Sequence, residues 1–72
     1  SLLEYNIPAA KREAAEDLTP GFNSPTVTNL EDPDWFSIRA MVRRKEVIDI
    51  MEKLEELGAK AILETSIANC RL

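Results

Sequence analysis

The sequence predicts an α+β domain in which two strand–helix–strand units follow each other and build a four-stranded antiparallel sheet. Three features lead to this prediction. Residues 35–42 alternate apolar and polar side chains, as in a strand with one buried face. Residues 47–57 repeat apolar side chains with helical spacing. Turn signals at 19–21 and 31–34 interrupt the chain, so the predicted elements are short enough for one small domain.

The first strand and the first helix precede the first turn signal. In residues 2–7 apolar and polar side chains alternate, which predicts a strand with one buried face. Pro8 suits the first turn of a helix, because its missing N–H would have no partner there. The helix is predicted over residues 9–18, with a narrow face of small residues that comprises Ala10, Ala14 and Leu18. Thr19-Pro20-Gly21 ends this helix.

A hairpin is predicted in the middle of the chain. Residues 26–28 are β-branched and polar enough for a short edge strand. The turn at 31–34 connects this strand to the third strand, which is the clearest in the sequence. The predicted buried face of the third strand comprises Phe36, Ile38, Ala40 and Val42. Its opposite face comprises Trp35, Ser37, Arg39 and Met41.

The second helix is the best-determined element of the sequence. Its apolar stripe comprises Val47, Ile50, Met51 and Leu54, widened by Ile48 and Leu57. Gly58 is placed to cap its C-terminus. Residues 61–63 predict a last strand. The tail is predicted to be extended and partly packed through Thr65, Ile67 and Leu72.

This order of elements predicts a ferredoxin-like βαββαβ fold, formed as one domain by residues 1–72. Right-handed crossovers place both helices on one face of the sheet. The opposite face carries Trp35 and Met41, and no element of this chain is left to cover it. We therefore expect this face to contact another subunit or a parent chain.

Composition and charge exclude several classes of function. The chain has 13 acidic and 9 basic residues and a net charge of −4, the wrong sign for binding nucleic acid. No apolar run approaches about 20 residues and the start lacks a signal-peptide pattern, so we expect no membrane partner and a cytoplasmic location. With no histidine and only Cys70, the chain has no Cys/His metal site and lacks the commonest general base. The absence of histidine therefore disfavours most hydrolase mechanisms.

Four segments carry a resemblance to a known family. They are residues 3–8 (LEYNIP), 18–26 (LTPGFNSPT), 38–42 (IRAMV) and 57–63 (LGAKAIL), of which the second and the last are the most specific. In order and spacing they resemble the C-terminal domain of long-form ATP phosphoribosyltransferase, the first enzyme of histidine biosynthesis, over essentially all 72 residues. The motifs of that family's two catalytic domains are not among these residues.

The resemblance implies a regulatory domain of a glycosyltransferase, without an active site of its own. The family's ATP, phosphoribosyl diphosphate and magnesium contacts belong to its catalytic domains, so no cofactor is implied here. L-Histidine is implied as the effector, bound near a subunit boundary for feedback inhibition. Self-association is implied too, as a trimer of this domain, similar to the trimeric nitrogen-regulatory signal proteins, and a hexamer of the parent enzyme. The effector-binding positions carried over are Asn6, Phe22, Ser24, Thr26, Met41 and Ala61.

One position departs from the family pattern. Several members carry an acidic residue where this chain has Asn6, and an amide accepts a hydrogen bond without offsetting the charge of an ammonium group. Asn6 also suits an N-cap of the first helix. Residues 43–45 (RRK) favour a solvated or subunit-facing cluster over an anion site, and Cys70 favours packing over a reactive thiol.

Three other functions compete with the regulatory one. A small phosphatase of the acylphosphatase kind needs an anion-cradling loop with an arginine beside the first strand, which residues 6–8 do not offer. An RNA-binding module needs aromatic and basic side chains interleaved on the central strands, where only Trp35 and Arg39 approximate them. A purely architectural oligomerisation domain with no functional effector site remains the main alternative.

Overall fold

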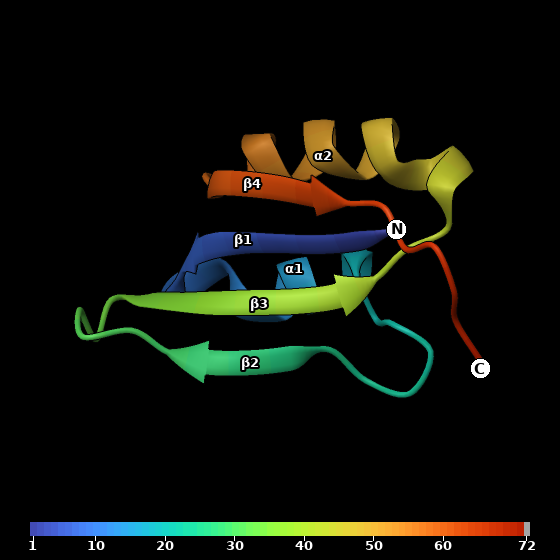
Figure 1. Cartoon of the computed structure of the whole chain (residues 1–72). Helices are drawn as coiled ribbons and strands as arrows, with labels where there is room; N and C mark the ends of the chain where they lie inside the picture. The colour runs from blue at the N-terminus through green and yellow to red at the C-terminus, as the bar shows by residue number, and fades with distance from the viewer. Residues whose placement is uncertain (72) are drawn as a thin grey trace.

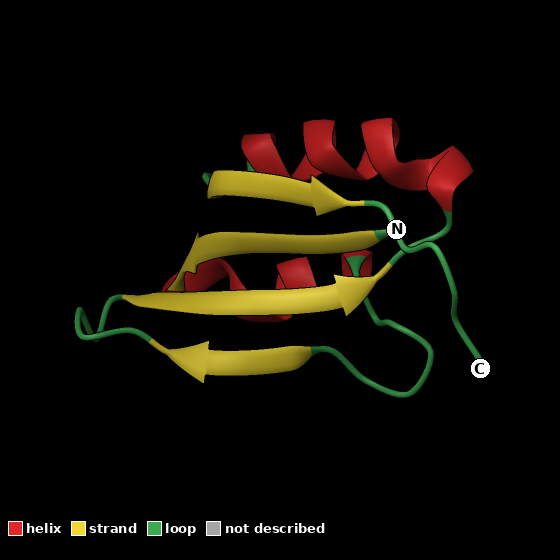
Figure 2. Cartoon of the chain, in the orientation of Figure 1, coloured by secondary structure: helices red, strands yellow, loops and turns green. Residues whose placement is uncertain are grey.

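A computed structural model describes residues 1–71 as one sheet with its helices on one side. The elements are β1 (Leu2–Pro8), the 3-10 turn η1 (Ala9–Lys11), α1 (Arg12–Leu18), β2 (Thr26–Asn29), β3 (Trp35–Met41), the 3-10 turn η2 (Arg44–Glu46), α2 (Val47–Glu56) and β4 (Lys60–Thr65). The four strands are antiparallel, in the order β2-β3-β1-β4. Figures 1 and 2 show α1 behind β1 and β3, and α2 behind and above β4. The predicted ferredoxin-like fold is confirmed.

The core lies between the sheet and the two helices. Its most deeply buried members are Leu3, Tyr5 and Ile7 of β1, Ile38 of β3, Ala15 of α1, and Val47 and Leu54 of α2. The predicted inner face of the third strand and the predicted stripe of the second helix are therefore confirmed, except at one position. Ile48 is 68% exposed. It follows Val47 by one residue, about 100° around the helix, which turns it toward solvent instead of widening the buried stripe.

The buried face of the first helix differs from the prediction. Ala10 and Ala14 are exposed, whereas Ala15 is fully buried and Leu18 is half-buried. The reason is that Pro8 ends β1 instead of opening a helix, and the next three residues form a 3-10 turn. A 3-10 turn advances about 120° per residue and an α-helix about 100°, so the face that meets the sheet is shifted by one residue. No helix in residues 1–71 is long and apolar enough to cross a membrane.

The last strand is longer than predicted, and the tail is less packed. β4 covers residues 60–65 instead of 61–63, because its backbone pairs with β1 as far as Leu2 opposite Thr65. The tail after β4 is exposed from Ser66 to Arg71, and Ile67 retains 37% of its surface. The expected packing is wrong for Thr65 and for Cys70, which are exposed, whereas Ile67 is partly packed. Leu72 lies outside the described residues.

A buried hydrogen-bond cluster ties the centre of the sheet to the end of α1. The Tyr5 hydroxyl lies 2.7 Å from the Thr19 hydroxyl and 3.4 Å from the carbonyl oxygen of Ala15. Thr19 also donates to Ala15 from its hydroxyl, at 3.1 Å. Thr19 is fully buried, and it directly precedes Pro20-Gly21. The cluster therefore fixes the point at which the chain leaves α1.

The Tyr5 hydroxyl should make the chain less stable in alkali. Burial raises its pKa above the ordinary value of 10.0, partly opposed by the hydrogen bond with Thr19. In the unfolded chain the phenol ionises near pH 10, while in the folded chain it stays protonated. The stabilisation that the protonated phenol gives the folded state is thus complete below about pH 10, and it declines as the pH rises through the folded pKa. Urea unfolding at a series of alkaline pH values should show a steeper decline in the native chain than in Tyr5→Phe. Equal slopes would contradict this expectation.

Candidate functional site

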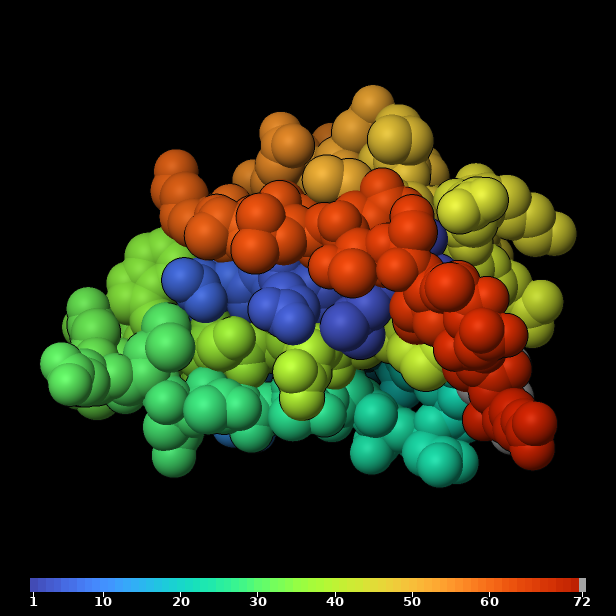
Figure 3. All heavy atoms as spheres, in the orientation of Figure 1, coloured from blue at the N-terminus to red at the C-terminus, as the bar shows by residue number. Residues whose placement is uncertain are grey.

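The sheet face opposite the helices is uncovered by the elements of residues 1–71, as predicted. Strand register arranges its side chains in rows across the sheet. One row comprises Leu63, Glu4, Arg39 and Thr26, from β4, β1, β3 and β2 respectively. The neighbouring row contains Leu2 paired with Met41. Figure 3 presents this face to the viewer, with the C-terminal tail passing over one end of it.

A cavity of about 560 Å³ opens at that end of the uncovered face. Its lining combines the loop between α1 and β2, the ends of β1, β2 and β3, and the tail. The lining residues are Leu2, Gly21, Phe22, Asn23, Ser24, Thr26, Arg39, Ala40, Met41 and Arg71. Four of the six residues predicted from the resemblance therefore lie around one cavity: Phe22, Ser24, Thr26 and Met41.

The loop that forms one wall of the cavity takes its shape from Gly21. Gly21 has a φ of +70°, a left-handed conformation that side chains with a Cβ rarely adopt. A Cβ added there would lie 3.2 Å from the carbonyl oxygen of Ser24, a tight contact that the loop could accommodate only by shifting. The predicted helix stop at Thr19-Pro20-Gly21 is confirmed, since α1 ends at Leu18. The same residues that stop the helix thus shape the cavity wall.

Asn6 and Ala61 do not line this cavity. Asn6 lies inside β1, where it pairs with Ser37 and Lys60 of the neighbouring strands. An N-cap role is also excluded, because neither η1 nor α1 has a side-chain cap. Ala61 borders a different cavity, beside Met51 and the first residues of β4.

Ala61 has an unusual backbone conformation. Its φ is +51°, the only positive φ at a residue other than glycine in the described chain. The pairing of β4 with β1 is irregular at this point, between Glu4 and Asn6 of β1. A residue in the left-handed region of a strand stores strain of the order of 1–2 kcal/mol. The sheet therefore holds a local distortion next to the open-face position of Asn6.

Two arginines of the cavity were not among the predicted site residues. Arg39 of β3 lies opposite Glu4 of β1, with its guanidinium 3.7 Å from the carboxylate. Arg39 was predicted on the same open face of the third strand as Met41, and this position could have identified it as a site residue. Arg71 reaches the cavity from the tail, and no local pattern in the sequence indicated this. Both guanidiniums give the cavity a positive lining within an acidic chain.

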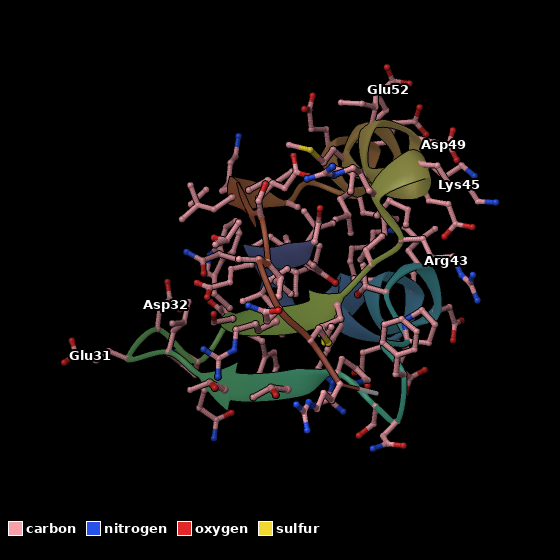
Figure 4. The ribbon with its side chains drawn as sticks, turned by 45° about the vertical axis from the view of Figure 1, so that its right-hand side comes forward. Glu31, Asp32, Arg43, Lys45, Asp49 and Glu52 are labelled. Atoms are coloured by element: carbon pink, nitrogen blue, oxygen red, sulfur yellow. The ribbon has the colours of Figure 1, made fainter. Side chains whose placement is uncertain are left out.

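The basic cluster Arg43, Arg44 and Lys45 lies apart from this cavity's lining and is exposed, as expected for a solvated cluster. Figure 4 shows Arg43 and Lys45 extending outward at the start of α2, at the opposite end of the molecule from the acidic hairpin tip at Glu31 and Asp32. A smaller cavity of about 210 Å³ lies nearby, with Arg43 and Glu46 among its lining residues. Gly21, Phe22 and Met41 line both cavities, so the two cavities are neighbours.

The cavity lining carries polar groups that can bind a ligand. Its polar groups are the hydroxyls of Ser24 and Thr26, the amide of Asn23 and the two guanidiniums. None of these is paired with a general base in the described residues, whose hydrogen bonds involve neither hydroxyl. Within residues 1–71 no group of three or more His, Cys, Asp or Glu side chains is placed to hold a metal ion. The arrangement suits a small polar ligand with an anionic group.

Comparisons with known proteins agree with the resemblance. Relatives at high identity are named ATP phosphoribosyltransferase. The one from Rhodopirellula baltica is 57% identical over 72 residues, which are 100% of this chain and 24% of that protein. The one from Saccharopolyspora erythraea is 48% identical over 71 residues, 99% of this chain and 25% of that protein. The one from Mycobacterium tuberculosis is 47% identical over 70 residues, 97% of this chain and 25% of that protein.

The chain thus spans about a quarter of the length of the curated relatives it matches. A family model described as "HisG, C-terminal domain" matches residues 1–69, nearly the whole of the sequence. The order of the elements, the Pro-Gly loop and the uncovered sheet face belong to this matched region. The chain belongs to the HisG C-terminal domain family.

Proposed function

We propose that this chain is the regulatory domain of an ATP phosphoribosyltransferase and binds L-histidine, the end product of the pathway, as a feedback inhibitor. The observation that carries the proposal is the convergence of Phe22, Ser24, Thr26 and Met41 on one cavity. These residues come from the α1–β2 loop and from two strands. The sequence resemblance identified them independently of the cavity. Transfer of the phosphoribosyl group, with its magnesium ion, would then belong to other parts of a cytoplasmic parent enzyme.

The composition of the cavity wall suits a small zwitterion with a flat side chain. Leu2, Phe22 and Met41 supply apolar and aromatic surface for an imidazole ring. The hydroxyls of Ser24 and Thr26 supply hydrogen-bonding groups, and Arg39 supplies positive charge for a carboxylate. The volume of about 560 Å³ is within the range of small-molecule sites.

We further propose that the site is completed by a neighbouring copy of the chain. Asn6 and Ala61 lie outside the cavity of their own chain, so they would contribute from an adjacent copy, near a subunit boundary. The uncovered sheet face is the surface for this association. It exposes 59% of Leu63 and parts of Trp35 and Met41, which a water-facing sheet would not favour. A trimer of this domain within a hexameric parent would bury these side chains.

The proposal is tested by thermal unfolding of the chain with and without L-histidine, with D-histidine as the control, and by its mass in solution. A ligand of the folded state stabilises it by RT ln(1 + [L]/Kd), about 2.7 kcal/mol at a hundredfold excess over Kd. We expect stabilisation by L-histidine alone and a trimeric mass. Absence of stabilisation by millimolar L-histidine in a folded trimer would refute effector binding by this chain.

The second candidate function is oligomerisation without an effector. One observation favours it. Asn6 stands where several family members have an acidic residue, so this chain lacks a negative charge that could pair with the ammonium group of the effector. The two candidates differ in the Thr26→Val variant, which keeps the shape of the side chain and removes its hydroxyl. L-Histidine binding should be lost in Thr26→Val while the mass in solution stays unchanged. A purely architectural domain would show no binding to lose.

A further inference from the structure

We propose that Arg71 and Arg39 form a clamp for the carboxylate of the ligand, and that Arg71, on the C-terminal tail, selects ligands that carry this group. The inference rests on the proposed function and adds a residue that the family resemblance does not assign.

The cavity lining is positively charged. Its only charged residues among those described are Arg39 and Arg71, although the chain as a whole carries 13 acidic and 9 basic residues. Three other cavities of the molecule each include a glutamate in their lining: Glu46, Glu4 and Glu55. Two guanidiniums in one cavity repel each other while it is empty, and a bound carboxylate removes that repulsion. This positive lining favours a ligand with an anionic group.

The C-terminal tail leaves the sheet next to the cavity. β4 ends at Thr65, directly opposite Leu2 of β1, and Leu2 lies opposite Met41 of β3. Leu2 and Met41 are both lining residues, so the tail leaves the sheet beside the cavity. Figure 1 shows the tail running from the end of β4 past the N-terminus and down across the end of β3, and Figure 3 shows it against the loop before β2. This path brings Arg71 to the cavity opposite the loop wall.

The guanidiniums of Arg39 and Arg71 both have N–H groups available for hydrogen bonds to a ligand. The ion pair of Arg39 with Glu4 is long, at 3.7 Å, and both side chains are about half exposed, at 55% and 43%. A guanidinium offers five N–H donors, so a single long contact leaves Arg39 most of its hydrogen-bonding capacity. Arg71 is exposed on a tail that contributes nothing to the core. Two planar guanidiniums from different segments can each present a pair of N–H groups to the oxygens of one carboxylate.

The experiment compares two ligands in four proteins. The ligands are L-histidine and L-histidinol, which has a hydroxymethyl group in place of the carboxylate. The proteins are the native chain, Arg71→Ala, Arg71→Lys and the control Arg44→Ala, which removes the same charge from an exposed arginine outside the cavity lining. Titration calorimetry gives each dissociation constant. Thermal unfolding without ligand verifies that all four proteins fold alike, as the exposure of Arg71 leads us to expect.

We expect Arg71→Ala to weaken binding of L-histidine by roughly tenfold and to change binding of L-histidinol by less than about twofold. The affinity of Arg71→Lys for L-histidine should lie between those of the native chain and Arg71→Ala, because a lysine keeps the charge and loses the planar pair of donors. Arg44→Ala should bind both ligands like the native chain. Equal loss of both ligands in Arg71→Ala, or no loss of either, would overturn the clamp while leaving the proposed function intact. A native chain that binds neither ligand would refute the proposed function and the clamp with it.

Discussion

Replacing Leu54 by alanine should lower the free energy of unfolding by about 2–5 kcal/mol, the range for a truncated leucine in a packed core. Leu54 is fully buried in α2, where it belongs to the core cluster with the strands. A core of this size supplies only about 3–5 kcal/mol in total. The variant should therefore be largely unfolded at room temperature, as measured by circular dichroism and urea titration.

The same helix provides a matched control. Ile48 has a side chain of similar size, but 68% of it is exposed. Ile48→Ala should change the free energy of unfolding by no more than about 0.5 kcal/mol. Similar losses in the two variants would mean that α2 is rotated relative to the sheet, or that Ile48 is buried against another copy of the chain. The mass in solution at several protein concentrations separates these two explanations.

Gly21→Ala is expected to affect both stability and ligand binding. A left-handed φ of +70° costs a residue with a Cβ about 1–2 kcal/mol, and crowding against the carbonyl oxygen of Ser24 adds to this. The loop must shift to relieve the contact, and Ser24 is a lining residue of the cavity. Thermal unfolding should show the loss of stability, and calorimetry with L-histidine should show weaker binding.

Gly58→Ala separates these two effects. Gly58 also has a positive φ, of +92°, but an added Cβ would meet only the ring of Pro8, at an ordinary 3.6 Å. It follows α2, and it is not a lining residue of the cavity. Gly58→Ala should therefore lower stability and leave the dissociation constant for L-histidine unchanged. Native-like stability in Gly21→Ala would contradict the assignment of strain to the loop.

The fold was predictable because the strongest local patterns agree with the tertiary arrangement. The alternation around Ile38 on β3 and the spacing of Val47, Ile50 and Leu54 on α2 both define a buried face without help from the rest of the chain. The face of α1 was not predictable in the same way. Its residues are nearly all good helix formers, so nothing local distinguishes Ala14 from Ala15. The 3-10 turn before α1 sets that choice.

The resemblance to a known family predicted four residues of the candidate site, namely Phe22, Ser24, Thr26 and Met41. Phe22, Ser24 and Thr26 belong to one loop, and the Pro-Gly signal marks that loop. Arg71 joins them through the course of the tail after β4, which depends on how far β4 pairs with β1. Asn6 lies in the strand predicted for residues 2–7, but its pairing with Ser37 and Lys60 places it outside the cavity lining. Long-range strand pairing decides both positions, and local sequence does not encode it.

The position of β1 in the sheet has a consequence for the order of folding. Among the elements of residues 1–71, β1 is synthesised before the others, yet it is paired on both sides, by β3 and by β4. Its apolar side chains at Leu3, Tyr5 and Ile7 must therefore wait for partners from the middle and the end of the chain. Contacts between such distant residues are slow to form, and an unpaired apolar strand is prone to aggregate. This domain is consequently most vulnerable to aggregation between the synthesis of β1 and the synthesis of β4, which closes the sheet.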